Sequence, residues 1–395
     1  MKKKIIIFST ITSNILFLAI VSFLNDLSSE MLMPIIPSYL INVLGISKIL
    51  SSSIMGSIEA FSSLFKVLFG YISDKLKKRK VFIFIGYTIS TISKAFLAFS
   101  TLWWDFLLLR ILDRIGKGIR TAPRDALIAS SVKESKTGGA FGFHRMLDTC
   151  GAILGPLITL IFLEKIKKYP TDIGYKLLFL ASSIPGIMAL SIIFFFIKDE
   201  NQNEHLKKKV KDISSLKDIN ITLFFLVIAI SALGRYSYAF TIWKAQELRY
   251  SIFQTIGFYA LFNLTYALSS YPFGIYSDKV GKKHMLIFGF LISIMASIIF
   301  SIARDSIFLL IAFILYGIYI AIEDTIPRAY LAEKAKGFER ATVIGTYHSI
   351  FGVLIFPASI ICGLLWQNIG INCTFLYSAI MNSFAMFLMF FVKDK

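Results

Sequence analysis

Residues 70–80 read GYISDKLKKRK, and residues 274–284 read GIYSDKVGKKH. Both runs carry a glycine, a serine, an aspartate, a lysine and a closing pair of basic residues at the same offsets, 204 positions apart. Each run lies between two strongly apolar stretches. A segment that recurs at a fixed offset predicts that the chain consists of two structurally related halves.

The repeat extends beyond these two runs, because Pro123-Arg124 matches Pro327-Arg328 at the same offset. The longest polar gap, residues 198–218, stands near the middle of the chain and reads as a linker on the cytoplasmic side. We therefore expect an N-terminal six-helix bundle over residues 1–197, a cytoplasmic linker over 198–219 and a C-terminal six-helix bundle over 220–395.

The composition excludes a water-soluble protein. Of the 395 residues, 56% are hydrophobic and 38 are phenylalanine, and the mean hydropathy is +0.71; this composition is typical of a membrane protein. The formal net charge of +18 would favour nucleic-acid binding in a soluble protein. Here most lysines and arginines occupy short gaps between apolar segments. We interpret them as topology signals and expect the lipid bilayer, not nucleic acid, as the partner.

Apolar stretches of about 20 residues, the length that crosses the hydrocarbon core of a bilayer, recur along the chain. They lie near residues 12–40, 52–73, 81–100, 102–123, 141–163, 176–197, 220–245, 253–276, 285–303, 306–328, 342–366 and 371–392. Placing the basic start of the chain in the cytoplasm puts most of the basic gaps on that side as well. The pattern predicts an all-α protein of the cell membrane, with twelve transmembrane helices in two pseudo-symmetric bundles and both termini in the cytoplasm.

Over essentially the whole chain, these features resemble the major facilitator superfamily of secondary transporters. The family's loop motif between helices 2 and 3, GxxxDKxxxRK, is similar to residues 70–80 and is echoed at 274–284. Residues 110–127, RILDRIGKGIRTAPRDAL, resemble the helix 4 motif, with Arg110 in the arginine position. Residues 151–156, GAILGP, resemble the helix 5 motif of proton-driven exporters. We expect close helix packing at Gly151, Gly155 and Pro156.

The repeated loop is expected to hold cytoplasmic helix ends together. Its basic residues can donate to the last carbonyls of a helix, and its aspartate can pair with a cation or with the N-terminus of a neighbouring helix. Such contacts must break when two halves rock apart, so we interpret the loop as a conformational latch. The alternative is that only its positive charge matters, for topology, but topology requires no aspartate. The latch residues are Gly70, Asp74, Lys75, Arg79, Gly274, Asp278, Lys279 and Lys283.

Three further residues near the cytoplasmic ends are candidates for a gate. His144 and Asp148 are four residues apart, on the same helical stripe as the two packing glycines. Because histidine changes protonation near neutral pH, the couple can relay a proton. Its place near the cytoplasmic entrance favours a gate contact instead, and Arg124 is assigned to the same gate.

Charged residues inside the spans carry more information, because each is costly unless it faces a partner or a water-filled cavity. Asp26 and Glu30 are four residues apart and share a helix face. An acid on a cavity face that alternates between protonated and charged forms provides the chemistry of proton coupling. A structural pairing with Lys66 or Lys94 is the alternative.

Arg110 and Asp113 are three residues apart and are expected to form an ion pair in the cavity. A functional role for this pair competes with a purely structural one. In the second half of the chain, Arg235 is the charged residue expected to face the cavity.

The function expected from these residues is secondary active transport of a small solute. The sequence contains no nucleophile elbow, phosphate loop or zinc spacing, so we expect no enzyme activity, no ATP-driven mechanism, no cofactor and no metal. The helix 5 resemblance favours proton-coupled export. We also expect the protein to act as a monomer. The alternatives are uptake of an organic anion and, from another class, a non-transporting receptor or assembly factor.

Overall fold

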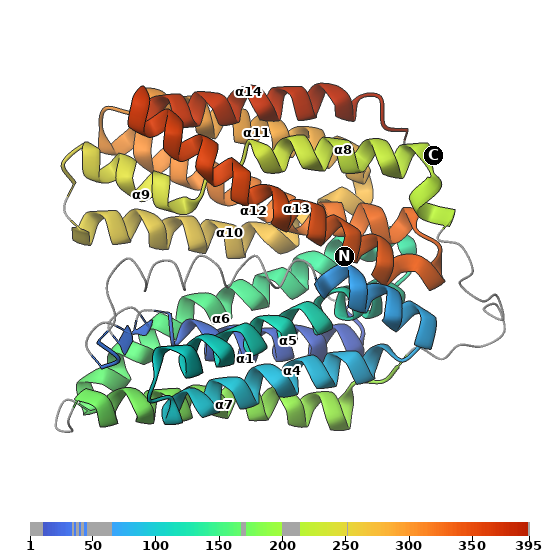
Figure 1. Ribbon diagram of the computed structural model, residues 1–395. Coiled ribbons are helices and arrows are strands. Elements are labelled where there is room, and N and C mark those ends of the chain that lie inside the picture. Colours follow the sequence, from blue (N-terminus) through green and yellow to red (C-terminus); the bar gives the residue numbers. More distant parts are fainter. Residues whose placement is uncertain are drawn as a thin grey trace, which may run out of the picture. The chain divides into compact units, whose positions relative to one another are not determined.

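The computed structural model describes residues 11–33, 35–36, 39–40, 43–45, 65–166, 171–199, 214–250 and 252–393. These residues fold into long α-helices joined by short turns, and none of them is in a β-strand (Figure 1). The all-α class predicted from the sequence is therefore confirmed. The helix expected near 52–73 lies outside the described residues except for its end, where residues 65–76 are helical.

The helices of the first half follow the expected apolar stretches, with ends that are set by local capping. The Thr12 side chain accepts a hydrogen bond from the Ile15 N–H (3.4 Å) at the start of the first helix. Asp105 accepts one from the Leu102 N–H (3.3 Å) at the start of α5, where a negative charge is favourable. The helices are α1 (Ser13–Glu30), α4 (Arg79–Phe96), α5 (Trp103–Ser130), α6 (Thr137–Ile166) and α7 (Thr171–Phe196).

The helices of the second half also match the expected stretches, with one exception. They are α8 (Ile219–Leu233), α9 (Tyr238–Glu247), α10 (Ile252–Val280), α11 (Lys282–Ile302), α12 (Ser306–Lys334), α13 (Arg340–Asn368) and α14 (Ile371–Met389). The single helix expected over 220–245 is wrong, because the chain breaks between α8 and α9. Gly234 caps the end of α8, and the Tyr316 hydroxyl donates to the Tyr236 carbonyl (3.1 Å) beside the break. A break inside apolar surroundings is tolerated only where freed backbone groups find such partners.

Within the described residues, seven helices have the length and apolarity needed to cross a membrane. α5 spans 28 residues, which is also long enough at about 1.5 Å per residue. Its many charged residues keep it out of that group, and a helix that carries such charges requires polar surroundings inside the protein. The charged positions of α5 therefore point to the candidate site.

The helices pack into two compact units. Among the described residues, the first unit comprises those up to 132, those of 147–199 and 338–346; the second comprises 133–146, those of 214–337 and those of 347–393. Each unit thus includes the beginning of one helix from the other half of the sequence. In the first unit, α4 and α5 approach closely, since a Cβ atom on Gly86 would lie 2.6 Å from the Gly116 carbonyl oxygen. In the second unit, an aromatic core joins α10, α11, α12 and α14. The expected division at residues 197 and 220 stays a prediction.

Candidate functional site

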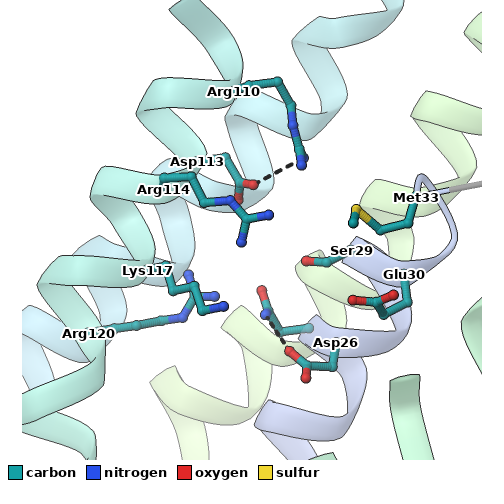
Figure 2. A pocket seen from close by; sticks show the side chains of 10 residues that line it. Asp26, Ser29, Glu30, Met33, Arg110, Asp113, Arg114, Lys117 and Arg120 are labelled. Atoms are coloured by element: carbon teal, nitrogen blue, oxygen red, sulfur yellow. Dashed lines mark hydrogen bonds and ion pairs between the residues drawn. The ribbon is translucent and has the colours of Figure 1, made fainter. Parts of the chain in front are cut away.

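A pocket lined by charged residues opens between α1 and α5 within the first unit (Figure 2). It holds about 410 Å³ of empty volume, including its open mouth. Its lining residues are Asn25, Asp26, Ser29, Glu30, Met33, Arg110, Asp113, Arg114, Lys117 and Arg120. All of them except Met33 are polar or charged, which is unusual for a small-molecule pocket.

The α5 wall of the pocket is basic because its charged residues recur at helical spacing on one face. At the deep end, the Arg110 guanidinium donates to the Asp113 carboxylate at 3.2 Å, and both side chains are buried. Arg120 is also buried; it donates to the Ser90 hydroxyl (2.5 Å), and its guanidinium lies 4.2 Å from the centre of the Tyr87 ring. The buried cations of this wall therefore have partners within the protein, as desolvated charges require. The roles predicted for Arg110 and Asp113 in transport stay predictions.

The α1 wall is acidic. Asp26 and Glu30 lie one turn apart and are half-buried, and Figure 2 shows both on the side facing the basic residues of α5. The Asn25 amide donates to the Asp26 carboxylate at 3.4 Å. Lys94 of α4 is fully buried behind this wall and donates to Ser29 Oγ at 3.2 Å. The sequence indicated Lys94 only as an alternative partner for the acids. Its hydrogen bond to Ser29 places it behind the α1 wall, although it does not line the pocket itself.

The sequence did not single out Arg114, Lys117 and Arg120 as lining residues of a pocket. Their spacing from Arg110, by 4, 7 and 10 residues, was the available signal, since these offsets repeat on one helix face. All three lie in the pocket with Arg110.

The glycines of the GAILGP segment hold α6 against α1. A Cβ atom on Gly155 would lie 2.7 Å from the Cβ atom of Glu30, and one on Gly151 would collide with the Phe23 carbonyl oxygen. One turn further along α6, the Thr159 hydroxyl donates to the Met31 carbonyl at 2.7 Å. α6 therefore fixes the part of α1 that carries the acids. Pro156 lies within α6.

The first copy of the repeated loop caps the N-terminus of a distant helix. Asp74 accepts hydrogen bonds from the backbone N–H of Thr342 (2.7 Å), from the Thr342 hydroxyl (2.7 Å) and from the Ala341 N–H (3.4 Å), all in the first turn of α13. Arg79 lies 3.8 Å from the same carboxylate. A Cβ atom on Gly70 would lie 2.5 Å from the Ala341 carbonyl oxygen, so only glycine permits this approach. The orphan N–H groups of the helix start thus receive a negatively charged cap.

The second copy makes the corresponding contacts within the second unit. Asp278 accepts hydrogen bonds from the N–H groups of Gly138 (2.9 Å) and Gly139 (2.8 Å) at the start of α6. Lys282 pairs with Asp278 (2.8 Å) and with Glu333 of α12 (2.5 Å). A Cβ atom on Gly274 would collide with the Gly138 carbonyl oxygen. Both copies therefore bring an aspartate and a glycine onto the first turn of another helix.

The basic residues of the loops do not all take part in these contacts. Lys75 and Lys279 are exposed, and Lys283 donates to the Phe390 carbonyl at 2.9 Å. In the second loop the cation at the aspartate is Lys282, one residue before the Lys283 that the sequence predicted. The 204-residue offset matches Arg79 to Lys283, but the cation that contacts the aspartate is Arg79 in the first copy and Lys282 in the second.

Of the predicted gate residues, Arg124 and Asp148 belong to the first unit and His144 belongs to the second. Arg124 donates to Asp125 (3.0 Å) and to the Ser22 hydroxyl (3.3 Å), and the same hydroxyl donates to Asp148. A chain of hydrogen bonds thus links α5, α1 and α6 in the first unit. His144 is fully buried on α6. The gate assignment stays a prediction.

In the second unit, two adjacent acids on α12 each meet an arginine. Arg235, beside the break between α8 and α9, donates to Glu323 at 2.6 Å, and the Tyr319 hydroxyl donates to the other oxygen of this carboxylate at 2.7 Å. Asp324 accepts hydrogen bonds from Arg145 and from the Tyr266 hydroxyl. The sequence singled out Arg235 alone. Its acidic partner lies 88 positions away, and no local spacing indicates the pair.

No group of three or more histidine, cysteine, aspartate or glutamate side chains that could hold a metal ion occurs in the part of the chain that the structure describes. The chemistry that the charged residues support is binding of polar groups and transfer of protons. Long apolar helices that enclose a charged pocket, together with duplicated loops that cap helix ends, define a membrane transport protein.

The family model of the Major Facilitator Superfamily matches residues 18–259 and 224–395, and the chain belongs to this superfamily. Its members are membrane-embedded transporters and not enzymes. An uncharacterized MFS-type transporter of Methanocaldococcus jannaschii is 36% identical over 391 residues, which cover 97% of this chain and 95% of the relative. Multidrug resistance protein MdtG of Salmonella arizonae is 27% identical over 288 residues, 69% of each chain.

Solved structures give the same fold. The human organic anion transporter MFSD10 is 17% identical with a TM-score of 0.74, covering 95% of this chain and 99% of that one. The proton:xylose symporter XylE is 14% identical with a TM-score of 0.75, covering 97% and 96%. The predicted architecture of twelve transmembrane helices in two pseudo-symmetric six-helix bundles is thereby confirmed.

Proposed function

We propose that this chain is a secondary active transporter of the cell membrane that exports a small solute in exchange for protons. It acts as a monomer by alternating access, with both termini in the cytoplasm. The latch contacts support alternating access, because Asp74 and Asp278 hold helix starts by charge and must release them when the cytoplasmic side opens.

The observation that carries proton coupling is the position of Asp26 and Glu30. Both are half-buried in a pocket whose opposite wall is basic. Arginine keeps its proton under all ordinary conditions, and Asp113 is committed to Arg110. Asp113 is buried, whereas Asp26 and Glu30 are half-buried; this exposure makes the two α1 acids the carboxylates of the pocket best placed to exchange a proton with water during a transport cycle.

Export is supported by two further observations. The GAILGP segment packs α6 on the acid-bearing part of α1, and this segment resembles the motif of proton-driven exporters. Among the relatives, MdtG carries a name that refers to multidrug resistance. Each observation favours export over uptake.

The test uses purified protein in liposomes that contain a pH-sensitive dye. An unbiased panel of metabolites and toxic compounds is added outside, with and without a pH gradient. In an antiporter, entry of the solute drives protons out, so the lumen becomes more alkaline; a symporter makes it more acidic. Acidification by the active solute would refute the proposed direction of coupling.

Two variants test the assignment of the acids. Asp26→Asn or Glu30→Gln mimics the protonated carboxyl, so the responsible variant should lose gradient-driven transport and keep exchange of solute for solute. Glu164→Gln, at an exposed position of α6, is the matched control and should behave as the unmodified protein. Unchanged gradient-driven transport in both pocket variants would remove these acids as proton carriers.

A further inference from the structure

Lys94 of α4 is a buried cation whose hydrogen-bond acceptors in the described structure are neutral. The residue is fully buried, and its ammonium group donates to Asn25 Oδ1 (3.4 Å) and to Ser29 Oγ (3.2 Å), both on α1. Taking a charge out of water is costly, and two neutral acceptors offset only part of that cost. The groups beyond these two acceptors therefore decide what the charge does.

One of the two acceptors connects Lys94 to Asp26. The Asn25 amide donates through Nδ2 to the Asp26 carboxylate at 3.4 Å (Figure 2), while its oxygen accepts from Lys94. An ammonium group has donors and no acceptor, so it fixes the amide oxygen on the α4 side and leaves the NH₂ group for the carboxylate. Turning the amide over would place its NH₂ group against the ammonium and its oxygen against the carboxylate, and both contacts are repulsive. Lys94 thus orients a donor toward Asp26.

We infer that Lys94 is a positioning residue for proton coupling, which holds the Asn25 amide as a donor to Asp26 and thereby stabilises the ionised carboxylate. The inference rests on the proposed function, in which Asp26 is one of the two candidate proton carriers. Both the directed amide and the positive charge favour the ionised form of a nearby carboxylate over the protonated form. With Lys94 in place, Asp26 therefore releases a proton to water more readily.

Other charges also surround Asp26, and the effect of Lys94 must be separated from theirs. α6 packs on α1 through its glycines and contributes Asp148, whose carboxylate accepts from the Ser22 hydroxyl. α7 also packs on α1, and both α7 and α4 carry their other charged residues near their starts. The charged residues that line the pocket with Asp26 are Glu30 on α1 and Arg110, Asp113, Arg114, Lys117 and Arg120 on α5. Lys94 differs from these in reaching Asp26 from behind α1, through Asn25, so a change at Lys94 leaves the α5 wall intact.

Infrared spectroscopy of the purified full-length protein in lipid bilayers measures this effect without a solute. The C=O stretch of protonated carboxyl groups is followed from about pH 4 to about pH 9, and the part of the signal that Asp26→Asn lacks belongs to Asp26. Lys94→Met removes the charge and keeps a long unbranched side chain. The Asp26 signal should then persist to a pH about one unit higher, because the ionised form loses a positive charge and an oriented donor. Lys94→Arg, which keeps both, should restore most of the difference.

Two further variants separate this role from a structural one. Asn25→Leu breaks the connection and leaves the lysine, so it should reproduce part of the shift; it also keeps the test available should Lys94→Met fail to fold. Lys244→Met is the matched control. Lys244 is also buried and donates to an asparagine, Asn372 Oδ1, at 2.7 Å, but it belongs to the second unit. This control should leave the Asp26 signal unchanged, whatever its effect on Tm.

An Asp26 signal with the same midpoint in the unmodified protein, in Lys94→Met and in Asn25→Leu would overturn the inference, as would the absence of a titrating Asp26 signal. A shifted midpoint together with unchanged gradient-driven transport in Asp26→Asn would leave Lys94 as the positioning residue and remove Asp26 as the proton carrier. Loss of gradient-driven transport in Asp26→Asn without a shift in Lys94→Met would do the reverse.

Discussion

Replacing Asp74 by asparagine should loosen the start of α13 without changing the fold. The side chain of Asp74 is fully buried and accepts two hydrogen bonds of 2.7 Å from Thr342 and one of 3.4 Å from the Ala341 N–H. Asparagine has nearly the same shape and keeps one acceptor oxygen. It loses the negative charge that complements the helix N-terminus and Arg79, and it presents an NH₂ group to donors.

The size of the effect follows from these contacts. Hydrogen bonds to a charged acceptor contribute about 1.5–3 kcal/mol, against about 0.5–1.5 kcal/mol for neutral partners. Weakening the two short bonds from Thr342 therefore costs about 2 kcal/mol in total. That change increases the population with the cap open about thirtyfold.

Hydrogen–deuterium exchange of the protein in lipid nanodiscs measures this population, since protected N–H groups exchange through local opening. With Asp74→Asn, exchange in the segment 338–346 should become about ten to thirty times faster, while the segment 137–146 keeps its protection. Asp278→Asn is the matched control and should give the reverse pattern, because its N–H partners are Gly138 and Gly139.

Unchanged protection of residues 338–346 in Asp74→Asn would refute the argument that the carboxylate holds α13. Equal loss of protection in both segments for either variant would also contradict it, since that result indicates general destabilisation and not loss of one cap.

The other predictions concern stability in detergent, measured as Tm. Lys77 and Gly281 occupy matching positions of the two loops, with positive φ angles of 56° and 94° that favour glycine. Lys77→Gly should therefore stabilise the protein by up to about 1 kcal/mol, and Gly281→Ala should destabilise it by about as much or more. A change of stability with the same sign in both variants would contradict this argument. Arg110→Ala strands the buried Asp113 carboxylate and should cost about 3–5 kcal/mol, while Arg110→Ala with Asp113→Ala should recover much of the Tm but no transport. Transport in the double variant would make this pair a structural element only. Gly155→Leu should abolish folding or transport, because its side chain would displace α1, whereas Gly363→Leu, with open space around its Cβ position, should be tolerated.

Local sequence determined the helices and the place of the loops. Apolar length is a property of a single segment, so the bounds of α5, α12 and α14 lie within a few residues of the expected stretches or extend them at the polar ends. The duplicated motif also marks the two places where an aspartate and a glycine contact the first turn of another helix. These features follow from the cost of exposing polar backbone or charge to lipid, which acts on each segment separately.

Contacts between distant segments could not be read from the sequence. Asp74 meets Thr342 across 268 positions, and Arg235 meets Glu323 across 88; no spacing rule covers such distances. The break between α8 and α9 has the same origin, because its freed carbonyl is satisfied by Tyr316 of α12.

The pocket shows the division most clearly. Sequence alone placed Asp26 with Glu30 on one helix face and Arg110 with Asp113 on another, because helical periodicity is local. Only the packing of α1, α4 and α5 decided that these faces oppose each other and that Lys94 lies behind them. A charge in a membrane protein is stable only where partners surround it. Some partners lie on the same helix, as Asp113 does for Arg110, but others, such as Glu323 for Arg235, come from other helices. The presence of the charges is thus a property of the sequence, whereas their pairing and their exposure to a solute are properties of the tertiary structure.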